Sequence, residues 1–322
     1  MMSAVSAFNR TLILLLAILF MAVLWGVGRL PDAALLMVVF TCLSSALLID
    51  IRSFGLRLKM AAVMGCYSCA AQFLISVSAA APFRQMVIAT LFAFFTFATL
   101  PDRRQACVVM LIGCLAFSVS PGFAAAVGRC PDILIGVIVI MIVTTAGSAG
   151  TGQLALPAMQ PYSLHEALAL ASELGIGMLI FRLLQLKQGV WIMLTILFIA
   201  MNEAAESSVK KFAYQRILAV PLGIIAGGFL LGTFCRIDYR FIWLVPFIGA
   251  AGFFMLYNYG NFFLFSIIFM IAMTLFADWA AGPYQRFNFW ESFFSRSAAT
   301  VYGALLELFL WPHQRVENGD TL

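Results

Sequence analysis

Hydrophobic residues run in long, nearly uninterrupted stretches along this chain, and most charged residues fall in the short segments between them. A helix that crosses the hydrocarbon core of a bilayer needs about 20 predominantly apolar residues. The pattern therefore predicts an all-α integral membrane protein with about 12 transmembrane helices. The predicted segments lie at about 11–27, 33–51, 58–80, 86–100, 106–123, 133–145, 166–186, 190–201, 216–234, 241–257, 261–277 and 297–311.

A stretch rich in Gly, Pro and Ser, Thr145 to Ser163, separates these segments into six and six. The stretch carries no charge and is typical of a connector. We therefore predict two six-helix halves. The N-terminal half is residues 1–146, the connector is 147–165 and the C-terminal half is 166–322.

The two halves resemble a degenerate repeat. A shift of 158 positions places Gly65 on Gly223 and Cys69 on Gly227, so small residues fall on small residues. Repeats of this kind are common in secondary transporters, where the substrate binds between the halves near the middle of the membrane.

Composition supports the membrane class, because 63% of the residues are hydrophobic and 10% are charged, against about 25% charged in soluble domains. The net charge of +5 is spread over short loops and forms no basic block, which excludes a nucleic-acid partner. With the N-terminus in the cytoplasm, the first half places six basic residues inside and three outside. Because early helices usually dominate insertion, we expect both termini in the cytoplasm, although the whole chain gives ten against nine.

Two predicted helices carry a stripe of residues at helical spacing that begins with an arginine and contains glycine. The stripes are Arg216, Val220, Gly223 and Gly227, and Arg296, Thr300, Gly303 and Glu307. Small residues let helix backbones approach closely, which is how helices associate in lipid. Pro221 cannot donate a hydrogen bond to the carbonyl of Ile217, so a polar group is free near Arg216. We expect these glycine stripes to form the joint at which the two halves meet.

Glu307 and Glu173 are the candidate proton-coupling residues, because an ionisable group inside lipid costs about 2.5–3.5 kcal/mol and is a functional candidate by default. Glu307 lies about 16 Å beyond Arg296 along one helix. The alternative for Glu307 is a carboxylate that reaches the headgroups or pairs with a basic residue. The alternative for Glu173 is a place in a solvated first turn.

Arg216 and Arg296 are candidates for binding an organic anion, since a guanidinium matches a carboxylate with two hydrogen bonds. The alternative is anchoring of a helix start to headgroups. Asn258 and Asn261 lie in an aromatic-rich stretch, Phe253 to Phe265, that suits stacking of an aromatic substrate, but packing and turn capping explain them equally well.

The sequence indicates no cofactor, no metal site and no enzyme chemistry. The two histidines are far apart, no Gly-rich phosphate loop is present, and Cys66 and Cys69 have no second ligand pair. We interpret the cysteines inside apolar runs as packing residues. Cys130 and Cys235 lie near loops and are open to pairing if both face an oxidising compartment.

Three stretches of the second half resemble the fusaric acid resistance / aromatic acid exporter family. They are GVWIMLTILFIAMNEAAESS at 189–208, YQRILAVPLGIIAGG at 214–228 and RSAATVYGALLELFLWP at 296–312. In that family a helix with Trp precedes an Arg and Gly helix, and the domain closes on a Trp-Pro. This chain departs from the pattern with Val220 in place of Thr and with no large soluble domain.

The resemblance implies a compact, membrane-only efflux protein of the bacterial inner membrane. Its substrates would be small organic or aromatic acids, its energy source the proton gradient, and its partners membrane lipid, a periplasmic adaptor protein and further copies in a homo-oligomer. Two alternatives stay open, a passive organic-anion channel and a non-transporting scaffold of an envelope export complex.

Overall fold

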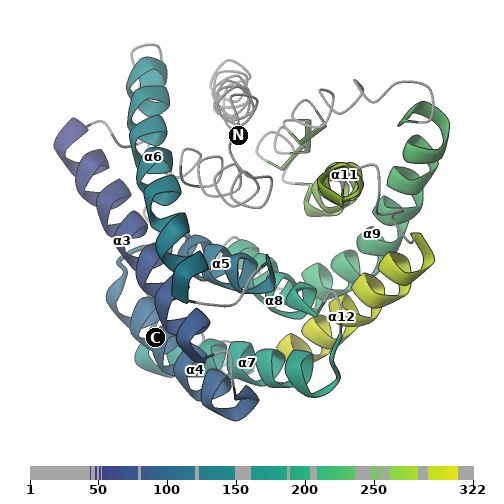
Figure 1. The fold of residues 1–322 in the computed structure, drawn as a ribbon, viewed down its shortest axis with the longest axis horizontal. Helices are drawn as coiled ribbons and strands as arrows, with labels where there is room; N and C mark the ends of the chain where they lie inside the picture. Colours follow the sequence, from purple (N-terminus) through teal and green to yellow (C-terminus); the bar gives the residue numbers. More distant parts are fainter. Residues whose placement is uncertain are drawn as a thin grey trace, which may run out of the picture.

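The computed structural model describes residues 44, 48, 51, 53–78, 81–119, 123–148, 161–186, 189–203, 209–235, 248–249, 251–252, 255–256, 261–281 and 289–310. Throughout these ranges the regular structure is helical, with no strand. The helices are α3 (Phe54–Ser78), α4 (Pro82–Thr99), α5 (Arg103–Val119), α6 (Phe123–Ser148), α7 (Leu164–Leu183), α8 (Val190–Glu203), α9 (Val209–Leu230), the π-helical η1 (Leu231–Cys235), α11 (Phe262–Ala281) and α12 (Phe289–Leu310) (Figure 1).

The all-helical class is confirmed, and nine of the predicted segments coincide with a described α-helix. Among the described residues, three helices are long and apolar enough to cross a membrane, and three shorter helices are apolar. The long ones are Pro82–Thr99, Leu164–Leu183 and Lys210–Thr233. The predicted segments at 11–27, 33–51 and 241–257 lie outside the described residues apart from isolated positions. The total of 12 therefore stays a prediction.

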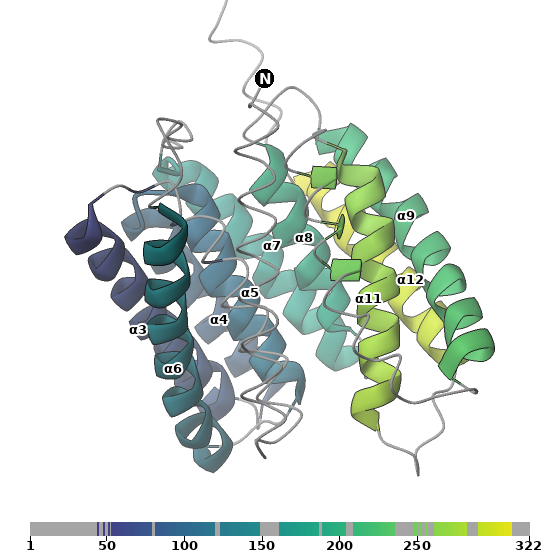
Figure 2. The ribbon, with the colours of Figure 1, turned by 90° about the horizontal axis from the view of Figure 1, so that it is seen from above.

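Helix α8 occupies the centre of the bundle. Every residue from Val190 to Ala200 is buried, as expected for a helix that is hydrophobic on all sides. It packs against α5, α7, α9 and α12. Figure 2 shows α8 with α7 between the group α3 to α6 on one side and α9, α11 and α12 on the other. Its 14 residues extend about 21 Å, which is shorter than the hydrocarbon core.

Packed neighbours in the bundle run parallel in some pairs and antiparallel in others. Helices α9 and α11 are parallel, because Phe212 pairs with Phe262 near their starts and Gly227 meets Thr274 further along. Helix α12 runs opposite to α9, with the Phe289 ring against Gly228. Helices α5 and α7 begin at the same end of the bundle, which we call the Arg103 end.

The glycine stripe of α9 packs against α11 and not against the first half. A Cβ atom on Gly223 would lie 2.5 Å from the Cβ of Met270 and 2.6 Å from the carbonyl oxygen of Ile267. Gly303 of α12 lies against α8 in the same way, with the carbonyl oxygen of Ile192 2.5 Å from its added Cβ. Both contacts lie within the second half. The expectation that these stripes join the two halves is therefore wrong, because their close-packing partners belong to the same half.

The predicted halves meet instead through α4 with α7 and α5 with α8. Gly175 of α7 makes the first approach possible, since a Cβ there would collide with the hydroxyl of Thr90. Two positions further on, Gly177 faces Ile192 of α8, 3.0 Å from its Cγ2 atom. Gly175 and Gly177 thus let α7 lie closely between α4 and α8.

The outward surface of the bundle is apolar. Along α9 the exposed side chains include Leu218, Leu222, Ile225 and Phe229, of which Phe229 is 70% exposed. On the same helix Arg216 is 0% exposed. A surface that presents large hydrophobic side chains and a core that holds charge is the arrangement expected in lipid.

We predict that Gly223→Ala lowers the stability of the bundle by about 1–3 kcal/mol, because the new methyl group would overlap the α11 backbone. Thermal unfolding in detergent measures this change. Gly232→Ala is the matched control, since no atom lies within 4 Å of a Cβ added at Gly232. Equal unfolding midpoints for the two variants would contradict the close approach of α9 and α11.

Candidate functional site

Two buried arginines from different helices lie against aromatic rings of α8. The Cζ atom of Arg216 on α9 is 4.7 Å from the ring centroid of Phe198. The Cζ atom of Arg296 on α12 is 5.3 Å from the ring of Trp191. Trp191 and Phe198 are seven positions apart, which is two helical turns, so they lie on one side of α8. The central helix thus presents two ring faces to two guanidinium groups.

Both arginines lie deeper in their helices than the sequence suggested. Helix α9 begins at Val209 and α12 at Phe289, so each arginine follows its helix start by two turns. Arg216 is 0% and Arg296 is 3% exposed. The alternative that these arginines anchor helix starts to lipid headgroups is therefore excluded, because neither side chain reaches the surface.

The polar surroundings of the arginines come from hydroxyl groups. Nη1 of Arg296 donates to Oγ1 of Thr274 on α11 at 3.4 Å. The three guanidinium nitrogens of Arg216 have no hydrogen-bond partner within the described part of the chain. The same holds, among the described residues, for the fully buried hydroxyls of Thr195 on α8, Ser266 on α11 and Thr300 on α12. Buried donors without partners are costly, so this region is unusual for a packed core.

Both candidate carboxylates are fully buried. Glu173 is 0% exposed in the middle of α7, which begins at Leu164, so the alternative of a solvated first turn is wrong. Glu307 is also 0% exposed, so it does not reach the headgroups. Glu307 of α12 lies near Cys107 of α5. Helix α12 therefore delivers a carboxylate to the Arg103 end.

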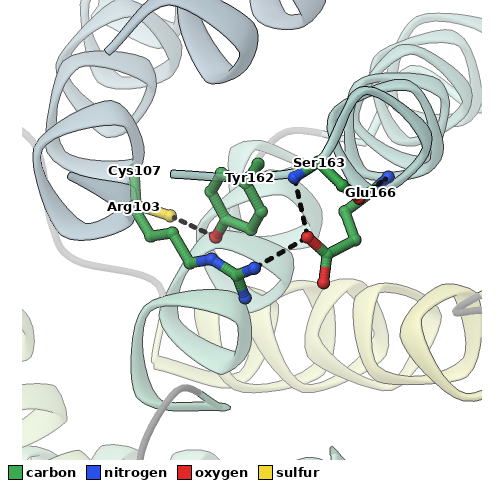
Figure 3. A network of polar contacts seen from close by, with 5 residues as sticks. All are labelled: Arg103, Cys107, Tyr162, Ser163 and Glu166. Carbon is green, nitrogen blue, oxygen red and sulfur yellow. Dashed lines mark hydrogen bonds and ion pairs between the residues drawn. The ribbon is translucent and has the colours of Figure 1, made fainter. Parts of the chain in front are cut away.

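A polar network at this end joins α5 to the start of α7 (Figure 3). Nη2 of Arg103 donates to Oε2 of Glu166 at 2.7 Å. The same oxygen accepts a hydrogen bond from the Ser163 backbone N–H at 2.9 Å, and the Ser163 hydroxyl accepts one from the Glu166 N–H at 3.2 Å. These reciprocal bonds form a capping box that fixes where α7 begins.

Tyr162 completes this network on its inner side. The Cζ atom of Arg103 lies 4.6 Å from the Tyr162 ring centroid, and the Tyr162 hydroxyl is 3.4 Å from the Cys107 sulfur. The Tyr162 ring also meets Phe97 edge-on. One arginine thus connects a carboxylate and an aromatic ring across the boundary between the predicted halves.

The other predicted site residues lie elsewhere. Asn261 caps α11, where its side-chain oxygen accepts from the Leu264 N–H at 3.0 Å. Asn258 lies outside the described residues. Pro221 lies inside α9, as the sequence implied. Sequence reasoning missed Trp191 and Phe198, although their two-turn spacing was a usable signal.

These observations define a polytopic α-helical membrane protein with charged residues in its interior. Residues 176–310 match the model of the family described as fusaric acid resistance protein-like. The matched segment contains Arg216, Arg296 and Glu307, and it begins three residues after Glu173. No curated protein and no solved structure matches the chain.

We predict that Arg216→Met leaves the thermal stability unchanged or raises it by up to about 1–4 kcal/mol, because methionine fills a similar volume without a buried charge. Arg103→Met is the matched control, since it would remove the ion-pair partner of the Glu166 carboxylate and lower stability by about 1–3 kcal/mol. Unfolding midpoints in detergent compare the two. A loss from Arg216→Met as large as that from Arg103→Met would show that Arg216 has a structural partner.

Proposed function

We propose that the protein is an inner-membrane efflux transporter that exports small organic acids, aromatic carboxylates among them, in exchange for protons. The family match supports transport of this class. The observation that carries the proposal is the burial of Arg216, Arg296, Glu173 and Glu307 inside an apolar bundle. Charges at such depth are retained where they bind substrate or move protons.

Arg216 and Arg296 form the proposed anion site. Guanidinium donors without partners attract a carboxylate, which would satisfy the nitrogens of Arg216 that have no partner in the described part of the chain. Trp191 and Phe198 offer ring faces beside these charges, and aromatic acids combine a carboxylate with a ring. The buried hydroxyls of Thr195 and Thr300 supply further donors.

Glu173 and Glu307 are the proposed proton carriers. A buried carboxylate exchanges protons most readily where its charged form is disfavoured by burial and its neighbours change during transport. The two residues lie on α7 and α12, and α7 packs against both α12 and the first-half helix α4. Movement between the halves would therefore alter the surroundings of Glu173.

The proposed orientation places the Arg103 end in the cytoplasm, as the sequence led us to expect. Among the described residues, the basic side chains near this end are Arg57, Lys59, Arg103, Arg104, Lys210 and Lys211. Near the opposite end the described chain has Arg84 and Arg182. Lysine and arginine are enriched on the cytoplasmic side of membrane proteins.

The two-half organisation is also part of the proposal. A shift of 158 positions carries α3, α5 and α6 onto the ranges 212–236, 261–277 and 281–306, which overlap α9, α11 and α12. In each set the first helix packs against the other two. This equivalence supports a repeat. A periplasmic adaptor and a homo-oligomer complete the proposed assembly.

Transport by purified protein in liposomes with an imposed pH gradient tests the proposal. We expect the wild type to accumulate benzoate-like acids against their gradient, and Glu307→Gln and Glu173→Gln to lose gradient-driven accumulation while they still exchange the acid across the membrane. Glu291→Gln is the control, because Glu291 lies in the partly exposed first turn of α12.

Unchanged driven accumulation in both glutamine variants would remove the two carboxylates from the proton path. If the wild type instead lets the acid equilibrate and a protonophore has no effect, the protein is a passive anion channel. Absence of any acid flux or binding by the wild type would favour a scaffold role.

A further inference from the structure

Helices α3 and α6 pack antiparallel in a well-defined register. Near the start of α3, Nη1 of Arg57 donates to the carbonyl oxygen of Thr144 near the end of α6. Two turns further along α3, a Cβ on Gly65 would lie 2.8 Å from Cγ2 of Val137 and 3.9 Å from Cγ2 of Ile133. Gly65 therefore brings the two helices close together at this level.

The same register places two cysteines opposite each other. Cys69 follows Gly65 by one turn on the same side of α3, and Cys130 precedes Ile133 by three positions on the facing side of α6. The Cys69 thiol lies near Cys130, and both side chains are partly accessible. No disulfide joins the two cysteines in this structure.

We propose that Cys69 and Cys130 form a dithiol site that a small disulfide oxidises to an intramolecular disulfide bond between α3 and α6. Helices brought together by a glycine one turn away suit the short Cα separation that a disulfide requires. This site is independent of the proposed transport function, because it lies in helices outside the family match.

The chemistry is thiol–disulfide exchange. The Cys69 thiolate attacks one sulfur of the small disulfide, forms a mixed disulfide and releases one small thiolate. The Cys130 thiolate then attacks the Cys69 sulfur, forms the new bond and releases the second thiolate. The two protons lost by the cysteines pass to the two released thiolates, so two cysteines are oxidised while one small disulfide is reduced to two thiols.

Other cysteines of the described chain suit this chemistry less well. Cys107 and Cys114 are buried on α5, with the Cys107 sulfur beside the Tyr162 hydroxyl. Cys66 precedes Cys69 by three positions, and it is exposed on the outer side of α3. Cys66 is therefore a matched comparison, since it is on the same helix and more exposed to reagents, but does not follow Gly65 by one turn.

The test uses the full-length protein with five cysteines replaced by serine so that Cys69 and Cys130 remain. The purified protein is treated with dipyridyl disulfide, free thiols are capped with iodoacetamide, and the peptides are weighed. We expect one linked pair of peptides, lighter by two hydrogen atoms than the uncapped dithiol pair, two released pyridinethione molecules per chain, and reversal by dithiothreitol.

A second variant, which retains Cys66 and Cys130 and carries Cys69→Ser, should form no internal bond and keep two separate pyridyl adducts. Monodisperse elution in detergent verifies that both variants are folded. The proposal would be overturned if Cys69 and Cys130 kept two separate pyridyl adducts or were both capped by iodoacetamide. Linkage of Cys66 to Cys130 in the second variant at the same rate would also overturn it.

Discussion

The close packing of α9 and α12 around α8, which places a guanidinium group on each of two α8 rings, is the constraint on which the rest of the structure depends. A cation above an aromatic face gains about 0.5–2 kcal/mol, which is small beside the cost of removing an arginine from water. Arg216 has Phe198 as its neighbour and no hydrogen-bond partner among the described residues. Such a side chain is hard to explain by stability alone. Its burial supports the proposal that a transient anion, and not the fold, satisfies the charge.

The architecture follows from the need to surround one short apolar helix closely enough for these contacts. Helix α8 has no polar stripe, so α9 and α12 must carry the charges to it, and glycine makes this possible. Gly303 brings α12 onto the α8 backbone, and Gly223 lets α11 lie directly beside α9. Aromatic rings of α11 then close around Phe198. At the Arg103 end, the ion pair of Arg103 with Glu166 fixes α7 to the first half.

Much of the fold was predictable because the hydrophobic runs are long and the charges are few. The buried stripes were predictable as well, since helical spacing alone groups Arg296, Gly303 and Glu307. The helices that pack against these stripes were not predictable, because a glycine face indicates that some helix packs closely against it but does not indicate which helix. This is why the stripes were assigned to the boundary between the halves. Helix starts were also misjudged, since α9 and α12 extend upstream of their arginines through stretches that contain Lys210, Lys211 and Glu291 and so give no apolar signal. Rings in an apolar helix likewise give no sign that a cation lies above them.

The proposed transport requires that the buried polar stripe of α12, which is Arg296, Thr300, Gly303 and Glu307, lines a route open to water and substrate. Thr300, between Arg296 and Glu307 on that stripe, is 0% exposed and tests the claim most directly as Thr300→Cys in a background without other cysteines. A small charged methanethiosulfonate reagent should label this thiol in native membranes, transported acid should slow the labelling, and lipid-facing Leu305→Cys should stay unlabelled. Labelling of an exposed Lys210→Cys control without any labelling of Thr300→Cys would show that the stripe is a closed core, and would contradict the account.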